Sequence, residues 1–248
     1  MKAIVLLAGY AVRLYPLTKD KPKALLTIND QPLMDLLFSK IDKIDEIDEA
    51  ILISNDRFYN NFLEWSKTYK GNKKITLLND GTTSNEDRLG AIGDLFFAIN
   101  KCGIDDEAMV LCGDHYFTFE LKDFYEYYKK VGTDCCIADV INDMEYLKQF
   151  GVGVTNEESI LVEMQEKPQE PKSNLRILAF YLYQKETMRL IKQYLDEGNN
   201  KDSPGNFLSW LYKRKPVHVH VPEGECVDIG TLKVYEELDQ RIRNENKK

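Results

Sequence analysis

The chain has 248 residues, and its 41 acidic and 33 basic side chains give a formal net charge of −8 at neutral pH. This acidic balance argues against a general nucleic-acid-binding surface, and the 43% of hydrophobic residues excludes a disordered chain. No apolar run reaches the length of a membrane span, so we expect one globular domain, residues 1–248, with neither a nucleic-acid nor a membrane partner.

The cysteines are scattered, and the adjacent pair Cys135 and Cys136 does not form a Cys-x-x-Cys motif. We therefore expect buried free thiols in a cytoplasmic protein, and neither disulfides nor a zinc site.

The chain begins with an apolar run, residues 2–7, whose length and β-branched residues predict a buried strand. Ala8 and Gly9 follow, where small side chains allow a sharp turn and the close approach of a ligand. Arg13 and Lys23 come next. A strand, a small-residue loop and two cations are typical of a phosphate site. The alternative is an ordinary turn with solvated basic residues, since neither GxxxxGK[ST] nor GxGxxG occurs here.

The next part of the chain alternates short apolar strands with helical periodicity. We predict strands at residues 50–53, 75–78 and 108–112, and helices at 32–44, at 58–69 and through Leu95 to Ile99, the last capped by Asp87 or Asn85. This alternation predicts a parallel sheet, in which ligands bind beyond the carboxyl ends of the strands.

Beyond residue 118 we predict strands at 134–140, 159–166, 174–183 and 216–221, with 159–166 in an antiparallel part. The predicted helices are 119–131, 185–195, 204–212 and 232–243. The aromatic residues of the helix at 119–131 should cover the sheet. His218 and His220 share one face of their strand, and we expect an exposed face and not a metal pair.

Polar residues stand at two predicted strand ends. Asn79 can donate and accept hydrogen bonds. Asp114 follows residues 108–112 directly, where a carboxylate is well placed for a hard cation such as magnesium.

Residues 5–28 resemble the signature of the sugar-1-phosphate nucleotidyltransferases, L-A-[AG]-G-x-G-[TS]-R-L-x-P-L-T followed by P-K. The matching residues are Ala8, Gly9, Arg13, Leu14, Pro16, Leu17, Thr18, Pro22 and Lys23. Two positions differ, because Ala11 replaces the second glycine and Val12 replaces a small hydroxyl residue. A methyl group at position 11 is unfavourable if that position needs a positive φ.

Later landmarks follow in the order of that family and cover nearly the whole chain. They are Gly113-Asp114, the glycine segment at Gly151, Glu166-Lys167-Pro168, and GECVDIGT at residues 224–231 with Asp228. The chain resembles the short, glucose-1-phosphate thymidylyltransferase-like members without a hexapeptide-repeat domain. The resemblance implies an α/β fold, a Rossmann-like three-layer sandwich with a mixed, mostly parallel central sheet and a small antiparallel acceptor-binding part.

The resemblance also implies an activity and a set of site residues. The activity is magnesium-dependent transfer of a nucleoside monophosphate from a nucleoside triphosphate to a sugar 1-phosphate, with release of pyrophosphate. The implied catalytic residues are Arg13, Lys23 and Asp114, and the metal ligands are Asp114 and Asp228. The implied nucleotide-binding residues are Leu7, Ala8, Gly9, Arg13, Lys23, Asn79, Arg88 and Gly90, and the acceptor-binding residues are Gly151, Glu166, Lys167 and Ala179.

Departures from the family pattern leave alternatives open. Leu178, Ala179 and Cys226 near the implied acceptor site are compatible with a cytidylyltransferase acting on phosphocholine or another small phosphate. Ala11 and Val12 are compatible with a catalytically silent, nucleotide-sugar-binding regulatory subunit. A metal-dependent glycosyltransferase would be expected to carry Asp-x-Asp where this chain has Asp114-His115-Tyr116. By analogy with related enzymes, a homo-oligomer is possible.

Overall fold

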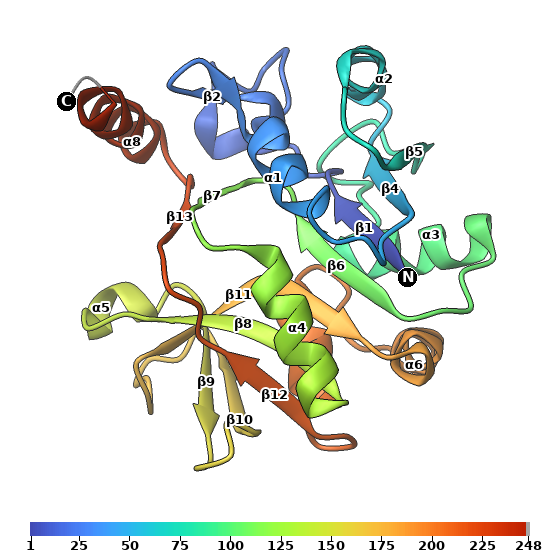
Figure 1. Ribbon diagram of the computed structural model, residues 1–248, viewed down its shortest axis with the longest axis vertical. Helices are drawn as coiled ribbons and strands as arrows, with labels where there is room; N and C mark the ends of the chain where they lie inside the picture. The colour runs from blue at the N-terminus through green and yellow to red at the C-terminus, as the bar shows by residue number, and fades with distance from the viewer. Residues whose placement is uncertain (247–248) are drawn as a thin grey trace.

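The computed structural model describes residues 1–246 and contains a nine-stranded mixed sheet with helices on both faces (Figure 1). The strands are β1 (Lys2–Leu6), β2 (Thr27–Ile28), β3 (Gln31–Pro32), β4 (Glu49–Ser54), β5 (Lys74–Asn79), β6 (Ala108–Cys112), β7 (His115–Phe117), β8 (Asp134–Val140), β9 (Gly151–Thr155), β10 (Leu161–Glu166), β11 (Leu175–Tyr183), β12 (Val217–His220) and β13 (Cys226–Asp228).

The helices connect and cover these strands. They are α1 (Leu33–Ile41), α2 (Tyr59–Thr68), α3 (Ala91–Cys102), α4 (Leu121–Val131), α5 (Met144–Leu147), α6 (Lys185–Asp196), α7 (Pro204–Leu211) and α8 (Leu232–Glu245), with 3-10 helices η1 (Val12–Leu14) and η2 (Lys23–Leu25). Over residues 1–246, no helix has the length and apolarity that crossing a bilayer requires.

The three layers follow from the alternation of side chains along the strands. In β1, Ala3 and Val5 face one core with α1, α2 and α4, whereas Ile4 and Leu6 face the other core with α3, α6 and α7. Successive strand side chains point to opposite faces, so an entirely apolar strand buries both faces. The predicted three-layer α/β sandwich is therefore confirmed.

The central strands run parallel in the order β5-β4-β1-β6, as the alternation of strands and helices predicted. On the other side of β6 the sheet becomes mostly antiparallel, although β12, at its edge beside β8, pairs parallel there. The long strand β11 pairs antiparallel with β6, with β8 and, at its beginning, with β9, which in turn pairs with β10. The antiparallel part predicted around residues 159–166 is thus present, although β9 had not been recognised as a strand.

A third core cluster holds the C-terminal helix against the N-terminal loops. Leu238 and Ile242 of α8 pack with Leu14, Leu26 and Ile28. The short strands β13 and β7 pair antiparallel just before α8, with Asp228 opposite His115. Neither strand was predicted, because three residues carry too little periodicity to be recognised.

Two sequence predictions are wrong. Helix α3 begins at Ala91 after Gly90, whose φ is 81°, and it has no side-chain cap. Asp87 instead accepts hydrogen bonds from the backbone of Thr83 and Ser84, which makes it a turn residue.

The histidine face of β12 is not exposed. His218 Nδ1 and Thr133 Oγ1 are hydrogen-bonded at 2.7 Å. The centroid of the His220 ring lies 4.7 Å from that of Tyr127, and the same ring stacks on Phe124 of α4. Burial lowers the pKa of His220 from its ordinary value of 6.5. The predicted role of the α4 aromatics in covering the sheet is confirmed, and this cover leaves the two histidines half-buried.

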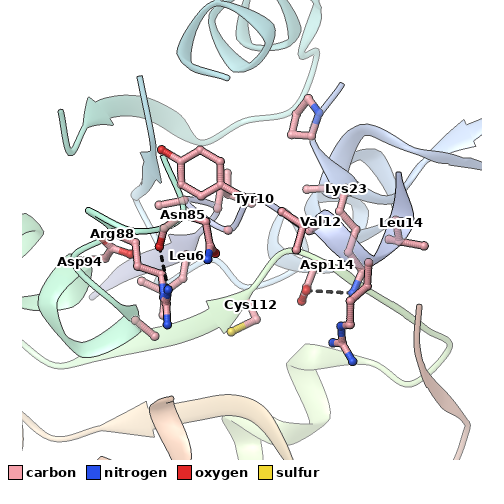
Figure 2. Close-up of a pocket in the computed structure, with 18 of the residues that line it drawn as sticks. Leu6, Tyr10, Val12, Leu14, Lys23, Asn85, Arg88, Asp94, Cys112 and Asp114 are labelled. Atoms are coloured by element: carbon pink, nitrogen blue, oxygen red, sulfur yellow. Dashed lines mark hydrogen bonds and ion pairs between the residues drawn. The ribbon is translucent and has the colours of Figure 1, made fainter. Parts of the chain in front are cut away.

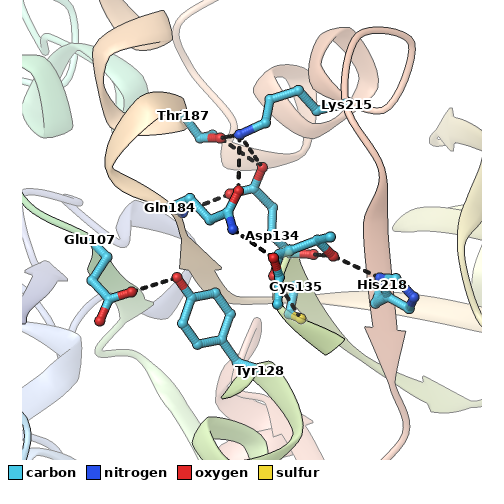
Figure 3. A network of polar contacts seen from close by, with 10 residues as sticks. Glu107, Tyr128, Asp134, Cys135, Gln184, Thr187, Lys215 and His218 are labelled. Atoms are coloured by element: carbon cyan, nitrogen blue, oxygen red, sulfur yellow. Dashed lines mark hydrogen bonds and ion pairs between the residues drawn. The ribbon is translucent and has the colours of Figure 1, made fainter. Parts of the chain in front are cut away.

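A buried polar network joins the start of β8 to the start of α6 (Figure 3). The fully buried Asp134 carboxylate accepts from the Gln184 backbone amide at 2.7 Å, from Thr187 Oγ1 at 2.6 Å and from Lys215 Nζ at 3.2 Å. The Asp134 carboxylate thereby provides a hydrogen-bond acceptor for a backbone amide at the start of α6, which would otherwise have no partner.

Candidate functional site

The loop after β1 is held by side chains from neighbouring segments. Asn55 Nδ2 donates to the carbonyl of Ala8 at 2.9 Å, and Thr18 Oγ1 donates to the carbonyl of Ala11 at 2.8 Å. Ala11 itself adopts the left-handed conformation, with φ 46° and ψ 42°. The position where the family pattern has glycine therefore does require a positive φ in this chain.

Lys23 joins two aspartates that are far apart in the sequence. Its Nζ lies 2.9 Å from Asp114 Oδ2 and 3.0 Å from Asp228 Oδ1, across separations of 91 and 205 residues. Pairing of β13 with β7 carries Asp228 to this position. The structure thus brings together the two aspartates and the lysine that the sequence had singled out.

Lys23 and Asp114 strongly influence each other's ionisation. Burial by itself would raise the pKa of Asp114, but the Lys23 ammonium and the neighbouring His115 hold it well below its usual value. Burial would lower the pKa of Lys23, whereas Asp114 and Asp228 raise it. Lys23 and Asp114 are therefore both charged at neutral pH.

The carboxylates of Asp114 and Asp228 suit a hard divalent cation. Both contact a single cationic atom, Lys23 Nζ, so a positive charge already lies between them. Residues 1–246 contain no group of three or more side chains arranged as metal ligands. Two carboxylates, with phosphate oxygens and water in the other positions, are the usual donor set for Mg²⁺.

A first cavity of about 410 Å³ lies beyond the carboxyl ends of β1 and β6. Figure 2 shows Lys23 and Asp114 at one end of it, and Asn85, Arg88 and Asp94 at the other. The loop after β1 lines the space between them. Of the sequence-predicted residues, this cavity is lined by Leu7, Ala8, Gly9, Arg13, Lys23, Arg88, Gly90 and Asp114.

Asn79 does not line this cavity. Its Nδ2 donates to Asp56 Oδ1 at 2.7 Å, and its Oδ1 accepts from the Gly81 amide at 2.8 Å. Its amide group is therefore engaged in shaping the turn after β5.

A second cavity, of about 330 Å³, lies between β9, β10 and the start of α7. Gly151, Glu166, Lys167 and Ala179 line it together with Asp228. Burial raises the pKa of Glu166, which the neighbouring Lys167 partly offsets. A Cβ at Gly151 would lie 2.6 Å from Met164 Cε, so the Met164 side chain packs closely over this glycine. The four predicted acceptor residues thus lie around one cavity.

The two cavities adjoin one another. Arg13, Pro204 and Gly230 line both, and the Arg13 guanidinium lies over Gly230, about 4 Å from where a Cβ of that residue would be. A molecule in one cavity can therefore reach a molecule in the other beside Arg13.

Sequence reasoning missed several residues of these cavities. Arg176, which is 2% exposed, lines the second cavity, donates from Nε to Asp139 at 2.9 Å and lies 5.0 Å above the Phe150 ring. Asp94, which is 5% exposed, lines the first cavity. An acidic residue inside the apolar helical run 91–102 was the available signal for Asp94.

The chain is similar to a known protein family and to several known proteins over most of its length. A family model described as nucleotidyl transferase matches residues 2–245. The bifunctional protein GlmU of Methanocaldococcus jannaschii is 29% identical over 231 residues, which cover 93% of this chain and 51% of that protein. The UTP–glucose-1-phosphate uridylyltransferase AglF of Haloferax volcanii is 24% identical over 246 residues, 99% of this chain and 98% of AglF.

A solved structure has the same fold. The UTP-bound UGPase of Acinetobacter baumannii superimposes with a TM-score of 0.78 at 17% identity, over 97% of this chain and 92% of that one. The present chain spans about half the length of GlmU and nearly the full length of AglF.

Proposed function

This chain belongs to the nucleotidyl transferase family, and we propose that it transfers a nucleoside monophosphate from a nucleoside triphosphate to a sugar 1-phosphate. The products would be a nucleotide sugar and pyrophosphate. One observation carries the proposal: two cavities meet at a charged cluster, with Lys23 and Asp114 in the first, Asp228 in the second and Arg13 bordering both. One cavity for each substrate, with the charges at their junction, suits transfer between two phosphorylated molecules.

The first cavity would hold the triphosphate and the second the acceptor. Lys23 would bind the triphosphate, and Arg13 would neutralise the pyrophosphate as it leaves. In the second cavity, Lys167 would hold the acceptor phosphate and Glu166 would accept hydrogen bonds from acceptor hydroxyls. AglF is named for glucose 1-phosphate and aligns with 99% of this chain, which supports a hexose 1-phosphate as acceptor.

The chemistry needs little beyond positioning and charge neutralisation. A phosphate oxygen of the acceptor attacks the α-phosphorus in line, and the bond to the β-phosphate oxygen breaks as pyrophosphate departs. The attacking oxygen is already anionic, so no general base is required. Asp114 and Asp228 would hold Mg²⁺, which supplies Lewis-acid stabilisation of phosphate oxygens when bound.

Pyrophosphate release tests the proposal. Each common nucleoside triphosphate is combined with a set of sugar 1-phosphates and with phosphocholine, with Mg²⁺ and with EDTA. We expect Mg²⁺-dependent turnover with a sugar 1-phosphate, and a loss of kcat of about 100-fold or more in Asp114→Asn. The exposed Asp45, in the connection between α1 and β4, provides the matched control Asp45→Asn, which should be fully active.

Three results would contradict the proposal. Turnover with phosphocholine alone would assign a different acceptor. Absence of turnover with every pair would point to a silent binding subunit. Normal turnover in Asp114→Asn would remove Asp114 from the reaction.

A further inference from the structure

Two carboxyl groups lie together at the end of the first cavity away from Lys23. Asp94, in the first turn of α3, is 5% exposed, and its carboxyl group lies within hydrogen-bonding reach of that of Asp80, which follows β5 directly. Asp80 Oδ2 and Asp94 Oδ1 are both buried, and neither has a hydrogen-bond donor among residues 1–246. Two adjacent carboxylates repel one another, so two buried oxygens without another donor favour a single proton shared between them.

The surroundings of the pair hold Asp80 in place. Asp80 Oδ1 accepts from the Thr82 amide at 2.7 Å and from Thr82 Oγ1 at 2.8 Å. Thr82 Oγ1 also lies 3.3 Å from the hydroxyl of Tyr10, which lines the cavity. Within residues 1–246, no side chain except Asp80 forms a side-chain hydrogen bond with Asp94. One oxygen of Asp94 is therefore left for a molecule in the cavity.

The location of the shared proton determines what Asp94 can offer. Because the proton lies in the contact between the two carboxyl groups, the remaining oxygen of Asp94 can only accept a hydrogen bond. The pair also carries a net negative charge. The position against Asp94 therefore favours a ligand group that donates an N–H and disfavours a carbonyl oxygen.

We infer that Asp94, held by Asp80, determines which nucleoside triphosphate the chain uses, by accepting a hydrogen bond from an exocyclic amino group of the base. This inference rests on the proposed function, in which the first cavity holds the triphosphate and Lys23, at the opposite end from Asp94, binds its phosphates. The chain should then use ATP, CTP or GTP in preference to UTP or dTTP. Uracil and thymine present carbonyl oxygens on both sides of their single N–H, and these would face the negative pair.

Arg88 supplies a donor beside this acceptor. Its Nη1 donates to the Asn85 carbonyl at 2.7 Å and its Nη2 to Asp202 Oδ2 at 3.1 Å, which directs its guanidinium along the same wall of the cavity. A base with an amino donor next to a ring nitrogen or carbonyl acceptor matches Asp94 and Arg88 together.

The ionisation of the pair predicts a second measurable property, the pH dependence of nucleotide binding. Burial and the Asp80 charge raise the pKa of Asp94 to about 8. The other charged groups near the pair are Asp87, which acts on Asp80, and Lys201, which opposes the shift at Asp94. As the pH rises past about 8 the shared proton is lost, and two negative charges face one another and the nucleotide.

The experiment measures binding and turnover separately. Calorimetry without acceptor gives Kd for ATP, GTP, CTP, UTP and dTTP, and pyrophosphate release gives kcat/KM for the same set. We expect at least one amino-bearing triphosphate to exceed both UTP and dTTP by about tenfold or more in each measurement, as the loss of a hydrogen bond to a charged group predicts. Preference for UTP or dTTP, or equal use of all five, would overturn the inference.

Three variants test the role of Asp94 itself. Asp94→Ala should remove the preference. Asp94→Asn can donate to Asp80 and still present an oxygen, so it should keep the preference while losing the rise in nucleotide KM above about pH 8. The exposed Glu86 lies on the same loop outside the cavity, and Glu86→Gln should behave as wild type in both respects.

The possible outcomes separate the two proposals. Selective binding without turnover would contradict the proposed function and support the base preference. Turnover together with an unchanged nucleotide preference in Asp94→Ala would support the proposed function and contradict the role of Asp94 in base preference. Failure to bind any of the five nucleotides would overturn both. Should Asp94→Ala fail to fold, Asp94→Asn with the pH profile decides the matter.

Discussion

Of the five residues with side chains that have a positive φ among residues 1–246, two line the cavities. Ala11 has φ 46° and lines the first cavity, and Lys167 has φ 47° and lines the second. The left-handed conformation costs about 1–2 kcal/mol for a residue with a Cβ. Strain of this kind gathers at functional sites, where the surrounding structure imposes it.

Replacing Ala11 by glycine should stabilise the protein. The gain from relieving the left-handed strain exceeds the added entropy of the unfolded chain, so we expect the free energy of unfolding to rise by about 0.5–1 kcal/mol. Urea denaturation at pH 7 measures this change in the free energy of unfolding.

Ala24 provides the contrast, because it lies in the 3-10 helix η2 without a positive φ. Ala24→Gly should therefore lower the free energy of unfolding. An Ala11→Gly variant less stable than wild type would show that position 11 is not strained.

At the scale of elements, the β8–α6 junction depends on a single buried carboxylate. Asp134 accepts hydrogen bonds from the start of α6 and from Lys215, in the segment that precedes β12. Burial raises the pKa of Asp134, which its hydrogen bonds and Lys215 oppose. Removing such a group leaves its donors without a partner.

Asp134→Ala should lower the free energy of unfolding by about 2–4 kcal/mol. Asp196→Ala is the control, because Asp196 forms an exposed pair with Lys192 on α6 at 2.6 Å, and it should change stability by less than about 0.5 kcal/mol. Denaturant unfolding measures both. Neither residue lines either of the two cavities, so kcat/KM of the folded variants should match wild type. A small effect of Asp134→Ala on stability would show that the network contributes little.

At the scale of the whole molecule, the parallel part and the antiparallel part of the sheet each supply one cavity. The first cavity is formed by the loops after β1 and β5, and the second by β9, β10 and β11, with Arg13 between them. The contributions of the two parts to substrate binding should therefore be separable.

Lys167→Ala should raise KM for the acceptor by about tenfold to 100-fold and leave KM for the nucleotide nearly unchanged, because a charge-assisted contact to phosphate is lost only in the second cavity. Lys172 is the matched control. It belongs to the connection between β10 and β11 and pairs with Glu163 at 2.6 Å, and Lys172→Ala should have normal kinetics. Equal effects on both KM values would show that the cavities do not act separately.

Much of the fold follows from local patterns in the chain. The apolar run at residues 2–7 and the alternating helices predicted the parallel strands β1, β4, β5 and β6, because burial on both faces leaves a strong signal. The wrongly predicted cap of α3 has a non-local cause. The start of α3 is set by Gly90 packing against residue Lys201, and a contact with a distant segment has no signature near Asp87.

The candidate site likewise has features that the sequence predicts and features that only the tertiary structure establishes. The sequence by itself determined which residues carry the charges, namely Arg13, Lys23, Asp114 and Asp228, and that strands would end beside some of them. Only the tertiary structure decided that Lys23 contacts both aspartates, that the cavities meet at Arg13, and that Asp94 pairs with Asp80. The physical reason is that charge and periodicity are properties of short stretches, whereas a shared proton and an ion pair across 205 residues depend on distances that only packing sets.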